Sequence, residues 1–257
     1  MIDRSLSDPL VFSVEGARAL DRAVETELGL PTIVLMENAA RSLAEASLAL
    51  MRERTLDQVA IVCGPGNNGG DGLALARHLA CRGLDPFVGL TQPADMYKGD
   101  AATNLRAVEA LDLRLIDPIL AMAPQAAMAI VFRNGAFGST DEELRRLLVV
   151  DALLGTGISR APSPPIERAI RWMNGLRGRG ATILAIDVPT GLDADTGIPA
   201  GEHVVHSDVT VTLGGLKKGL LEPGSARYTG KLLVGDLGVP PAFMRRFALP
   251  PSRRFEA

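Results

Sequence analysis

This chain of 257 residues has few cysteines, few aromatic residues and no excess of basic charge. Its two cysteines cannot build a disulfide framework or a four-cysteine zinc site. Aromatic residues make up 4% of the chain, too few for a stacking platform that binds single-stranded nucleic acid. The 27 lysines and arginines are outnumbered by 30 acidic residues, so no basic excess is available for a nucleic-acid backbone or an anionic membrane. We therefore expect no nucleic acid and no membrane among the partners.

Long apolar runs are missing as well. The most apolar stretch, residues 119–132, is too short to span a bilayer and contains Pro124 and Gln125. The first residues carry an early acid, Asp3, and do not resemble a signal peptide. Hydrophobic residues still reach 47% of the chain, which is enough to bury a large core and excludes intrinsic disorder. We expect a soluble, cytoplasmic protein with a single domain over residues 1–257 and a core from about residue 13 to 240.

Segments typical of strands and helices alternate along most of the chain. Two N-terminal helices are expected first: one over residues 15–28, capped by Ser13 and ended by Gly29, and a second that starts at Pro31. The strands expected after them are residues 58–63, 85–91, 113–116, 147–150, 182–186, 209–213 and 231–234. The helices expected between strands are residues 73–81, 100–111 and 165–176. This alternation predicts an α/β fold, a Rossmann-like three-layer α-β-α sandwich with a mostly parallel central sheet and extra N-terminal helices.

Polar segments follow three of the expected strands, at residues 64–72, 151–157 and 187–193. Because ligands bind outside the carboxyl ends of parallel strands, we expect these segments to share one edge of the sheet. Taken singly, Asp151 and Asp187 are more simply helix caps. Together with Asn68 and Thr190 they offer oxygen ligands that suit an oxygen-preferring cation rather than zinc or copper. Proximity of two carboxylates could equally raise the pKa of one of them and make it a general acid.

The first of these segments also contains a glycine pattern. Gly64, Gly66 and Gly69 match the G-x-G-x-x-G spacing of turns that bind dinucleotides. So short a match is as well explained by a turn that only permits close packing of strand and helix, with Asp71 as the helix cap. Asp71 would repel a pyrophosphate at the helix end, and no Gly-Lys-Ser/Thr follows, so the segment is not a nucleoside-triphosphate loop. A nucleotide-binding oxidoreductase stays open as an alternative function.

Several motifs, taken together, resemble those of the NAD(P)H-hydrate epimerase family. They are GNNGGDG at 66–72, DALLGTG at 151–157, DVPTGLD at 187–193, LMENA at 35–39, TVT at 210–212 before Lys217, YTG at 228–230 and DLGVP at 236–240. The resemblance implies an isomerase that interconverts the R and S epimers of NADHX and NADPHX, cofactors hydrated at C6 of the nicotinamide ring. It also implies a functional partnership with a separate NAD(P)H-hydrate dehydratase, and it favours a homodimer. Relatives of this fold that serve as scaffolds leave a non-catalytic binding module as a second alternative.

The same resemblance assigns site residues. The substrate-binding residues that it implies are Asn67, Asn68, Gly69, Gly70, Asp71, Gly155, Thr156, Gly157, Ile158, Ser159, Arg160, Ala161 and Asp187. A potassium ion would be held by Asn68, Asp151 and Thr190. The family usually has serine where this chain has Thr190, and the hydroxyl ligand is retained. Some members carry a lysine in the second loop, where this chain has only Arg160, and Lys217 is a candidate for phosphate contact.

Epimerisation at C6 requires one acid and one base. If the hydroxyl leaves with help from the ring nitrogen, the carbon becomes planar and water can return to its other face. Opening of the ring to an aldehyde is the alternative route. We assign the catalytic acid/base role to Asp187.

Overall fold

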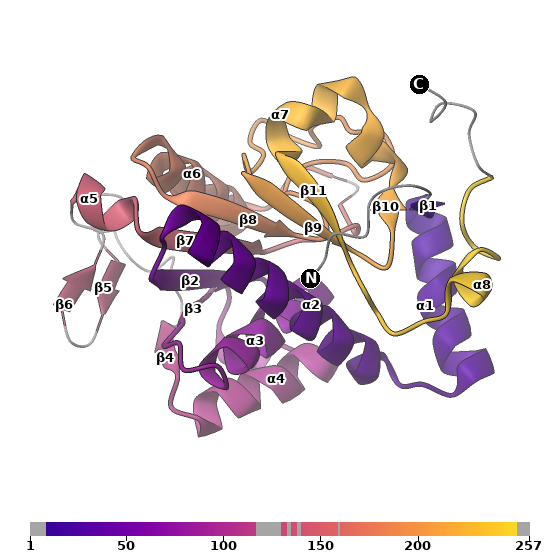
Figure 1. Ribbon diagram of the computed structural model, residues 1–257, viewed down its shortest axis with the longest axis horizontal. Helices are drawn as coiled ribbons and strands as arrows, with labels where there is room; N and C mark the ends of the chain where they lie inside the picture. The colour runs from indigo at the N-terminus through magenta and orange to yellow at the C-terminus, as the bar shows by residue number, and fades with distance from the viewer. Residues whose placement is uncertain (1–8, 117–129, 133–134, 138–139, 159, 251–257) are drawn as a thin grey trace.

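The computed structural model describes residues 9–116, 130–132, 135–137, 140–158 and 160–250 (Figure 1). Its centre is a seven-stranded sheet with the strand order β11-β9-β8-β7-β2-β3-β4. The strands are β2 (Gln58–Cys63), β3 (Phe87–Leu90), β4 (Arg114–Ile116), β7 (Leu147–Ala152), β8 (Thr182–Ile186), β9 (Val209–Leu213) and β11 (Lys231–Gly235). All pairings in this sheet are parallel. The predicted α/β fold with a parallel central sheet is confirmed.

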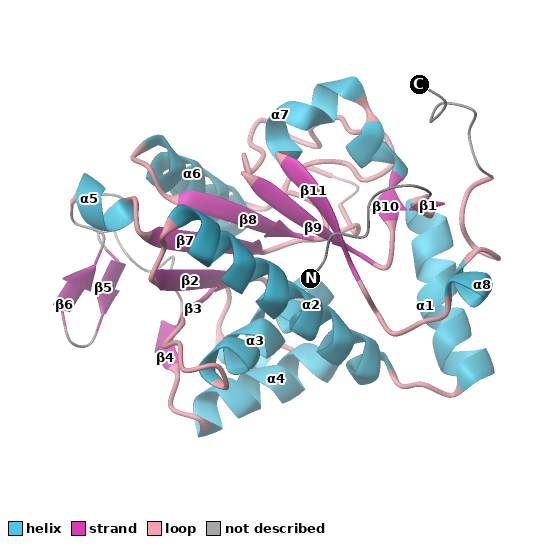
Figure 2. Ribbon diagram, viewed as in Figure 1, coloured by secondary structure: helices cyan, strands magenta, loops and turns pink. Residues whose placement is uncertain are grey.

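Helices cover both faces of the sheet (Figure 2). The helices are α1 (Val14–Leu28), α2 (Thr32–Arg54), α3 (Asn67–Ala80), α4 (Gly99–Ala110), α5 (Asp141–Leu144), α6 (Pro164–Gly178), α7 (Ala226–Thr229) and α8 (Pro241–Met244), with short 3-10 turns η1 (Ala94–Met96), η4 (Lys218–Leu221) and η5 (Pro223–Ser225). In β2, Ile61 packs with residues of α2, α3 and α4, whereas its neighbour Val62 packs with residues of α6. Because successive side chains of a strand point to opposite faces, one apolar strand serves both layers. The three-layer arrangement is therefore as predicted.

The N-terminal segment lies beside the far end of the chain (Figure 1). β1 (Val11–Phe12) pairs in parallel with β10 (Leu216–Lys217). Ser13 caps α1 by accepting a hydrogen bond from the backbone of Gly16, and Gly29 ends the helix with a φ of 66°, as predicted. The apolar residues of α1 pack with those of β1 and α8 in a separate small core. This placement puts the polar side of α1 next to the carboxyl edge of the main sheet.

Two smaller features complete the description. β5 (Ile130–Phe132) and β6 (Gly135–Phe137) form an antiparallel pair outside the main sheet. The apolar run over residues 119–132 is predicted not to span a bilayer. Most of it, residues 119–129, lies outside the described residues. Among the helices that the structure describes, none is long and apolar enough to cross a membrane.

The start of α3 differs from the prediction. The glycine-rich segment was expected to form a turn before a helix over residues 73–81, but α3 begins at Asn67. A Cβ added at Gly69 would lie 1.7 Å from the carbonyl oxygen of Gly64, and one at Gly72 would lie 2.5 Å from the Cβ of Ala152. The glycines therefore let the first turns of the helix lie directly against β2 and β7, and this packing outweighs their poor helix propensity.

Strand order places a crevice at the edge of the sheet. From β2 the chain moves to β3 and β4 on one side, and it then crosses to β7 on the other. A reversal of this kind leaves a space between the carboxyl ends of β2 and β7, where α/β proteins bind their ligands. The polar segments after β2, β7 and β8 meet at this edge.

Candidate functional site

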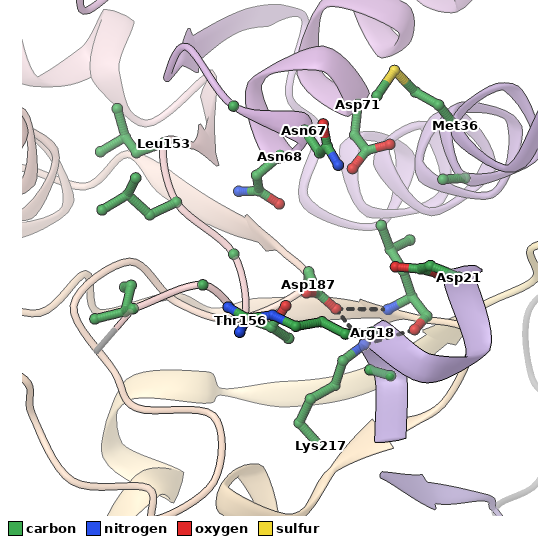
Figure 3. A pocket seen from close by; sticks show the side chains of 18 of the residues that line it. Arg18, Asp21, Met36, Asn67, Asn68, Asp71, Leu153, Thr156, Asp187 and Lys217 are labelled. Carbon is green, nitrogen blue, oxygen red and sulfur yellow. Dashed lines mark hydrogen bonds and ion pairs between the residues drawn. The ribbon is translucent and has the colours of Figure 1, made fainter. Parts of the chain in front are cut away.

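A cavity of about 1080 Å³ opens at the carboxyl ends of β2, β7 and β8. Its wall is built by the start of α3, the loop after β7, the residue after β8, the end of β10 and the polar side of α1 (Figure 3). Ligand pockets in proteins usually measure roughly 300–1,000 Å³. The cavity is thus large enough for a dinucleotide.

The first turns of α3 supply three polar side chains. Asn67, Asn68 and Asp71 line the cavity, and spacings of three and four residues put them on one side of the helix. The Nδ2 atom of Asn68 is buried and has no hydrogen-bond partner in the described part of the chain. Burial, followed by the charges of Asp187 and Asp21, raises the pKa of Asp71 well above its ordinary value, although Lys217 opposes the shift. This face of the helix presents polar groups that a ligand could satisfy.

Asp187 follows β8 in a left-handed backbone conformation with a φ of 66°, which is uncommon for a residue other than glycine. Its backbone N–H donates to the carbonyl of Val211 at 2.8 Å, which fixes this turn against β9. Its Oδ1 atom accepts hydrogen bonds from Lys217 Nζ and, at 3.2 Å, from the backbone N–H of Leu213. Its Oδ2 atom faces Gly155, where an added Cβ would lie 3.3 Å away. One oxygen is therefore anchored while the other faces the second loop.

Lys217 is buried behind Asp187. Its side chain is 4% exposed, and Nζ also donates to the carbonyl of Leu213 at 2.7 Å. The side chain is held there because β10 pairs with β1. Lys217 also lines the cavity, and its ammonium group is paired with the Asp187 carboxylate. Contact of Lys217 with a phosphate stays a prediction.

Asp151 and Thr190 are fully buried and directly bonded to each other. The Thr190 backbone N–H donates to Asp151 Oδ2 at 2.8 Å, and the Thr190 hydroxyl donates to Oδ1 at 2.7 Å. Burial raises the pKa of Asp151 to about 6, against the opposing effect of these hydrogen bonds. Neither side chain lines the cavity. Asp151 was expected at the end of its strand, but β7 continues to Ala152 and holds the carboxylate within the sheet.

Several oxygen atoms lie around this pair and could bind the cation that the sequence suggests. The Thr190 hydroxyl accepts from the Leu154 N–H at 3.0 Å and lies 3.1 Å from the Leu154 carbonyl oxygen. The next residue is Gly155, where an added Cβ would lie 3.2 Å from Asn68 Oδ1. Carboxylate, hydroxyl and carbonyl oxygens therefore meet at Asp151, Thr190 and Leu154, and the Asn68 amide oxygen lies beside the next residue, Gly155. Within the described residues, no cluster of three His, Cys, Asp or Glu side chains could hold a metal ion. The oxygen donors around Asp151 fit a hard cation of low charge.

The second loop lies along the cavity as the sequence suggests. Its described residues that line the wall are Gly155, Thr156, Gly157, Ile158, Arg160 and Ala161. Ser159 lies outside the described residues.

Gly69 and Gly70 were expected to bind substrate but do not line the cavity. Gly69 lies against the backbone of Gly64, and a Cβ at Gly70 would lie 2.7 Å from Met36 Cε. Their lack of a side chain serves the packing of α3 against its neighbours.

Helix α1 contributes wall residues that sequence reasoning missed. Arg18 and Asp21, three residues apart on α1, line the cavity opposite the second loop (Figure 3). A Cβ added at Gly157 would lie 3.8 Å from Arg18 Nη2, so the guanidinium group reaches across to that loop. The available signal was the polar side of an amphipathic helix, which by itself resembles any solvated surface.

Comparisons with known proteins show the family to which the chain is related. Residues 32–219 match the family model described as YjeF-related protein N-terminus. The chain is 36% identical over 244 residues to the bifunctional NAD(P)H-hydrate repair enzyme Nnr of Salinibacter ruber, covering 95% of this chain and 43% of that protein. It is 34% identical over 233 residues to the NAD(P)H-hydrate epimerase of Rhodopirellula baltica, covering 90% of this chain and 86% of that one.

Among solved structures, the crystal structure of the yeast protein ynu0 (YNL200c) is similar, with a TM-score of 0.71. The alignment covers 94% of this chain and 95% of the yeast chain at 23% sequence identity. At that identity the likeness supports the fold alone. The chain spans less than half the length of the bifunctional relative but most of the length of the stand-alone relative.

Proposed function

The chain belongs to the NAD(P)H-hydrate epimerase family, and from this premise we propose that its cavity binds NADHX or NADPHX and inverts C6 of the hydrated ring. The protein is an isomerase of nicotinamide-cofactor repair. The observation that carries the proposed site is the Asp187 carboxylate, with one oxygen anchored by Lys217 and the other facing the second loop.

The substrate would lie between the start of α3 and the loop after β7. Asn67, Asn68 and Asp71 offer polar contacts on one side. The described residues of the second loop, 155–158 and 160–161, offer backbone contacts on the other. Arg18 adds a positive charge near this loop, where a nucleotide phosphate could be bound. The cavity volume of about 1080 Å³ is consistent with a dinucleotide ligand.

Asp187 would act as the acid/base group at the C6 oxygen. The ammonium group of Lys217 compensates its charge and fixes the orientation of the carboxylate. The oxygen that faces Gly155 stays available to accept a proton from water or to return one to the hydroxyl. Because Asp187 has a left-handed backbone conformation, the backbone itself places this oxygen in the cavity wall, and no further side chain is needed to place it there.

A potassium ion bound by Asn68, Asp151 and Thr190 fits the oxygen donors at the edge of the sheet. Such an ion would supply a fixed positive charge next to the substrate loop. The Asn68 Oδ1 atom would be one of its ligands, and the charge of the buried Asp151 would be compensated.

The S epimer formed here would be consumed by a separate dehydratase. The relatives named bifunctional repair enzymes are longer than this chain, which matches 43% of the Salinibacter protein. We propose that the protein works together with an NAD(P)H-hydrate dehydratase activity and that it forms a homodimer, which light scattering after gel filtration would measure.

The direct test is to incubate the purified protein with R-NADHX and with R-NADPHX and to follow the S epimers by chiral chromatography. We expect interconversion with both or one of them, and loss of about 10²–10⁴-fold in rate for Asp187→Asn. Absence of any interconversion by the folded protein would overturn the proposal. A change in the absorbance of intact NAD(P)H on addition of substrates would point instead to an oxidoreductase.

A further inference from the structure

Inversion at C6 poses a problem that Asp187 alone does not solve. If the hydroxyl leaves from one face of the ring and water returns to the other, a proton is needed on one face and must be removed on the other. Lys217 is bonded to Asp187 and therefore serves the same side of the cavity. Resting on the proposed function, we propose that Asp71 is the second catalytic residue, a carboxyl group that serves the ring face opposite Asp187.

The geometry favours Asp71 over the other acidic residues of the wall. Figure 3 shows its carboxyl group entering the cavity from α3, on the side opposite the loop that carries Asp187. Asp71 is 8% exposed, and its carboxyl group has no hydrogen bond or ion pair with any residue that the structure describes. Asp100, by contrast, is bonded to the Thr32 hydroxyl, and Asp21 is exposed on α1. Asp71 is thus the buried and unengaged acid of the wall.

The surroundings of Asp71 favour its protonated form. Burial without a partner disfavours the carboxylate form, and the neighbouring acids Asp187 and Asp21 act in the same direction. The single cation that opposes them is Lys217, whose ammonium group is bonded to Asp187. The cavity therefore holds two carboxyl groups in different surroundings, one paired with a cation and one without a partner. Such a difference is typical of paired acid and base groups.

The proton balance of the reaction closes with these two groups. For the epimer whose hydroxyl faces Asp71, the C6–O bond breaks as that oxygen takes the Asp71 proton and leaves as water. The ring-nitrogen lone pair forms the C6=N bond. A water molecule on the other face then forms the new C6–O bond and gives a proton to Asp187. Nothing is oxidised. The turnover leaves Asp71 without its proton and Asp187 with one, and proton exchange of both groups with solvent water restores the starting state for the next turnover.

Two variants of Asp71 separate a catalytic role from a structural one. Asp71→Asn keeps the shape but has no acidic proton, and we expect kcat to fall by about 10²–10⁴-fold in both directions while KM changes little. Asp71→Glu keeps an acidic proton and should be at least tenfold faster than Asp71→Asn. If Asp71 only supports the wall, the closer match in shape, Asn, will be the better replacement. The control for the loss of an acid is Asp85→Asn, because Asp85 is an exposed carboxylate that is paired with Arg114 outside the cavity.

A labelling experiment on the unaltered protein tests the route. In water enriched in ¹⁸O, each inversion should place one solvent oxygen on C6, which mass spectrometry of the product detects. Inversion without label would indicate ring opening and overturn the proposal, as would Asp71→Asn with a rate within fivefold of the unaltered protein. If the unaltered protein does not interconvert the epimers at all, the proposed function itself fails, so the two failures can be distinguished.

Discussion

The buried ion pair between Lys217 and Asp187 leads to a quantitative prediction. The two side chains are 4% and 12% exposed, and the ammonium group also donates to the Leu213 carbonyl at 2.7 Å. Lys217→Met keeps much of the stem volume but leaves the Asp187 carboxylate without its cation. Removing one partner of a buried pair costs about 3–5 kcal/mol. Because Asp187 borders a cavity where water can solvate it, we expect about 3 kcal/mol of lost stability, at the lower end of that range.

For a chain of this size, 1 kcal/mol lowers the unfolding midpoint by about 2–4 °C, so Lys217→Met should lower it by roughly 6–12 °C. The assay is urea unfolding of Lys217→Met, Asp187→Asn and the double variant. The double variant should lose less stability than the sum of the single variants, by at least about 1.5 kcal/mol, because it leaves neither charge unpaired. Lys218→Met is the matched control: its side chain is 43% exposed, and its ion pair with Asp195 should contribute less than about 1 kcal/mol.

The reasoning is refuted if Lys217→Met costs no more stability than Lys218→Met, or if the losses of the two single variants are simply additive. Either result would mean that the pair is well solvated and that the left-handed backbone alone orients Asp187.

Three further predictions concern packing, cation binding and pH. Gly69→Ala places a Cβ 1.7 Å from the Gly64 carbonyl oxygen and should cost about 3 kcal/mol or more, whereas Gly66→Ala, with nothing within 4 Å, should cost less than about 1 kcal/mol in thermal unfolding. Potassium chloride should raise the unfolding midpoint above that in tetramethylammonium chloride, and Thr190→Val should abolish the difference; equal midpoints for the unaltered protein would contradict the cation site. Because burial raises the pKa of Asp151 from 3.8 to about 6, the folded state binds this proton more tightly, and the resulting stability is present below pH 4 and lost as the pH rises through 6. In potassium-free buffer the loss should be about 3 kcal/mol. It is measured by comparing the unfolding free energies of the unaltered protein and Asp151→Asn as the pH is changed. A difference that does not change with pH would contradict the assignment.

All seven strands of the main sheet could be predicted from the sequence, three with the observed bounds and four with ends that differ by one or two residues. The strands over residues 182–186 and 209–213 have the bounds that their apolar runs indicate. Fully buried parallel strands consist of continuous β-branched and aliphatic residues, and this local signal does not depend on distant contacts. The same apolar runs also predict where the three polar segments lie, because ligands bind outside the carboxyl ends of parallel strands and the segments follow those ends.

Other features depend on distant contacts, and local patterns do not contain them. The glycines after β2 favour a turn by propensity, but packing against Gly64 and Ala152 makes them the first turns of a helix. Lys217 meets Asp187 only because β10 is held by β1, a pairing across about two hundred residues of chain. A two-residue strand carries too little pattern to be recognised in a sequence. The roles assigned to the site residues stay predictions.

The pairing of β1 with β10 has a consequence for the order of events during synthesis. Val11 lies beside Leu216, the Val14 N–H donates to Asp195, and Asn38 donates to the Leu237 carbonyl, so the first and last parts of the chain complete each other. On the ribosome the earliest helix can pack against α2 at once, but it lacks its contacts with Asp195 and α8 until those segments have emerged. A nascent or prematurely terminated chain can build part of the sheet, yet it lacks the wall that α1 provides. Affinity for the damaged cofactor should accordingly arise late and all at once, and not grow with chain length.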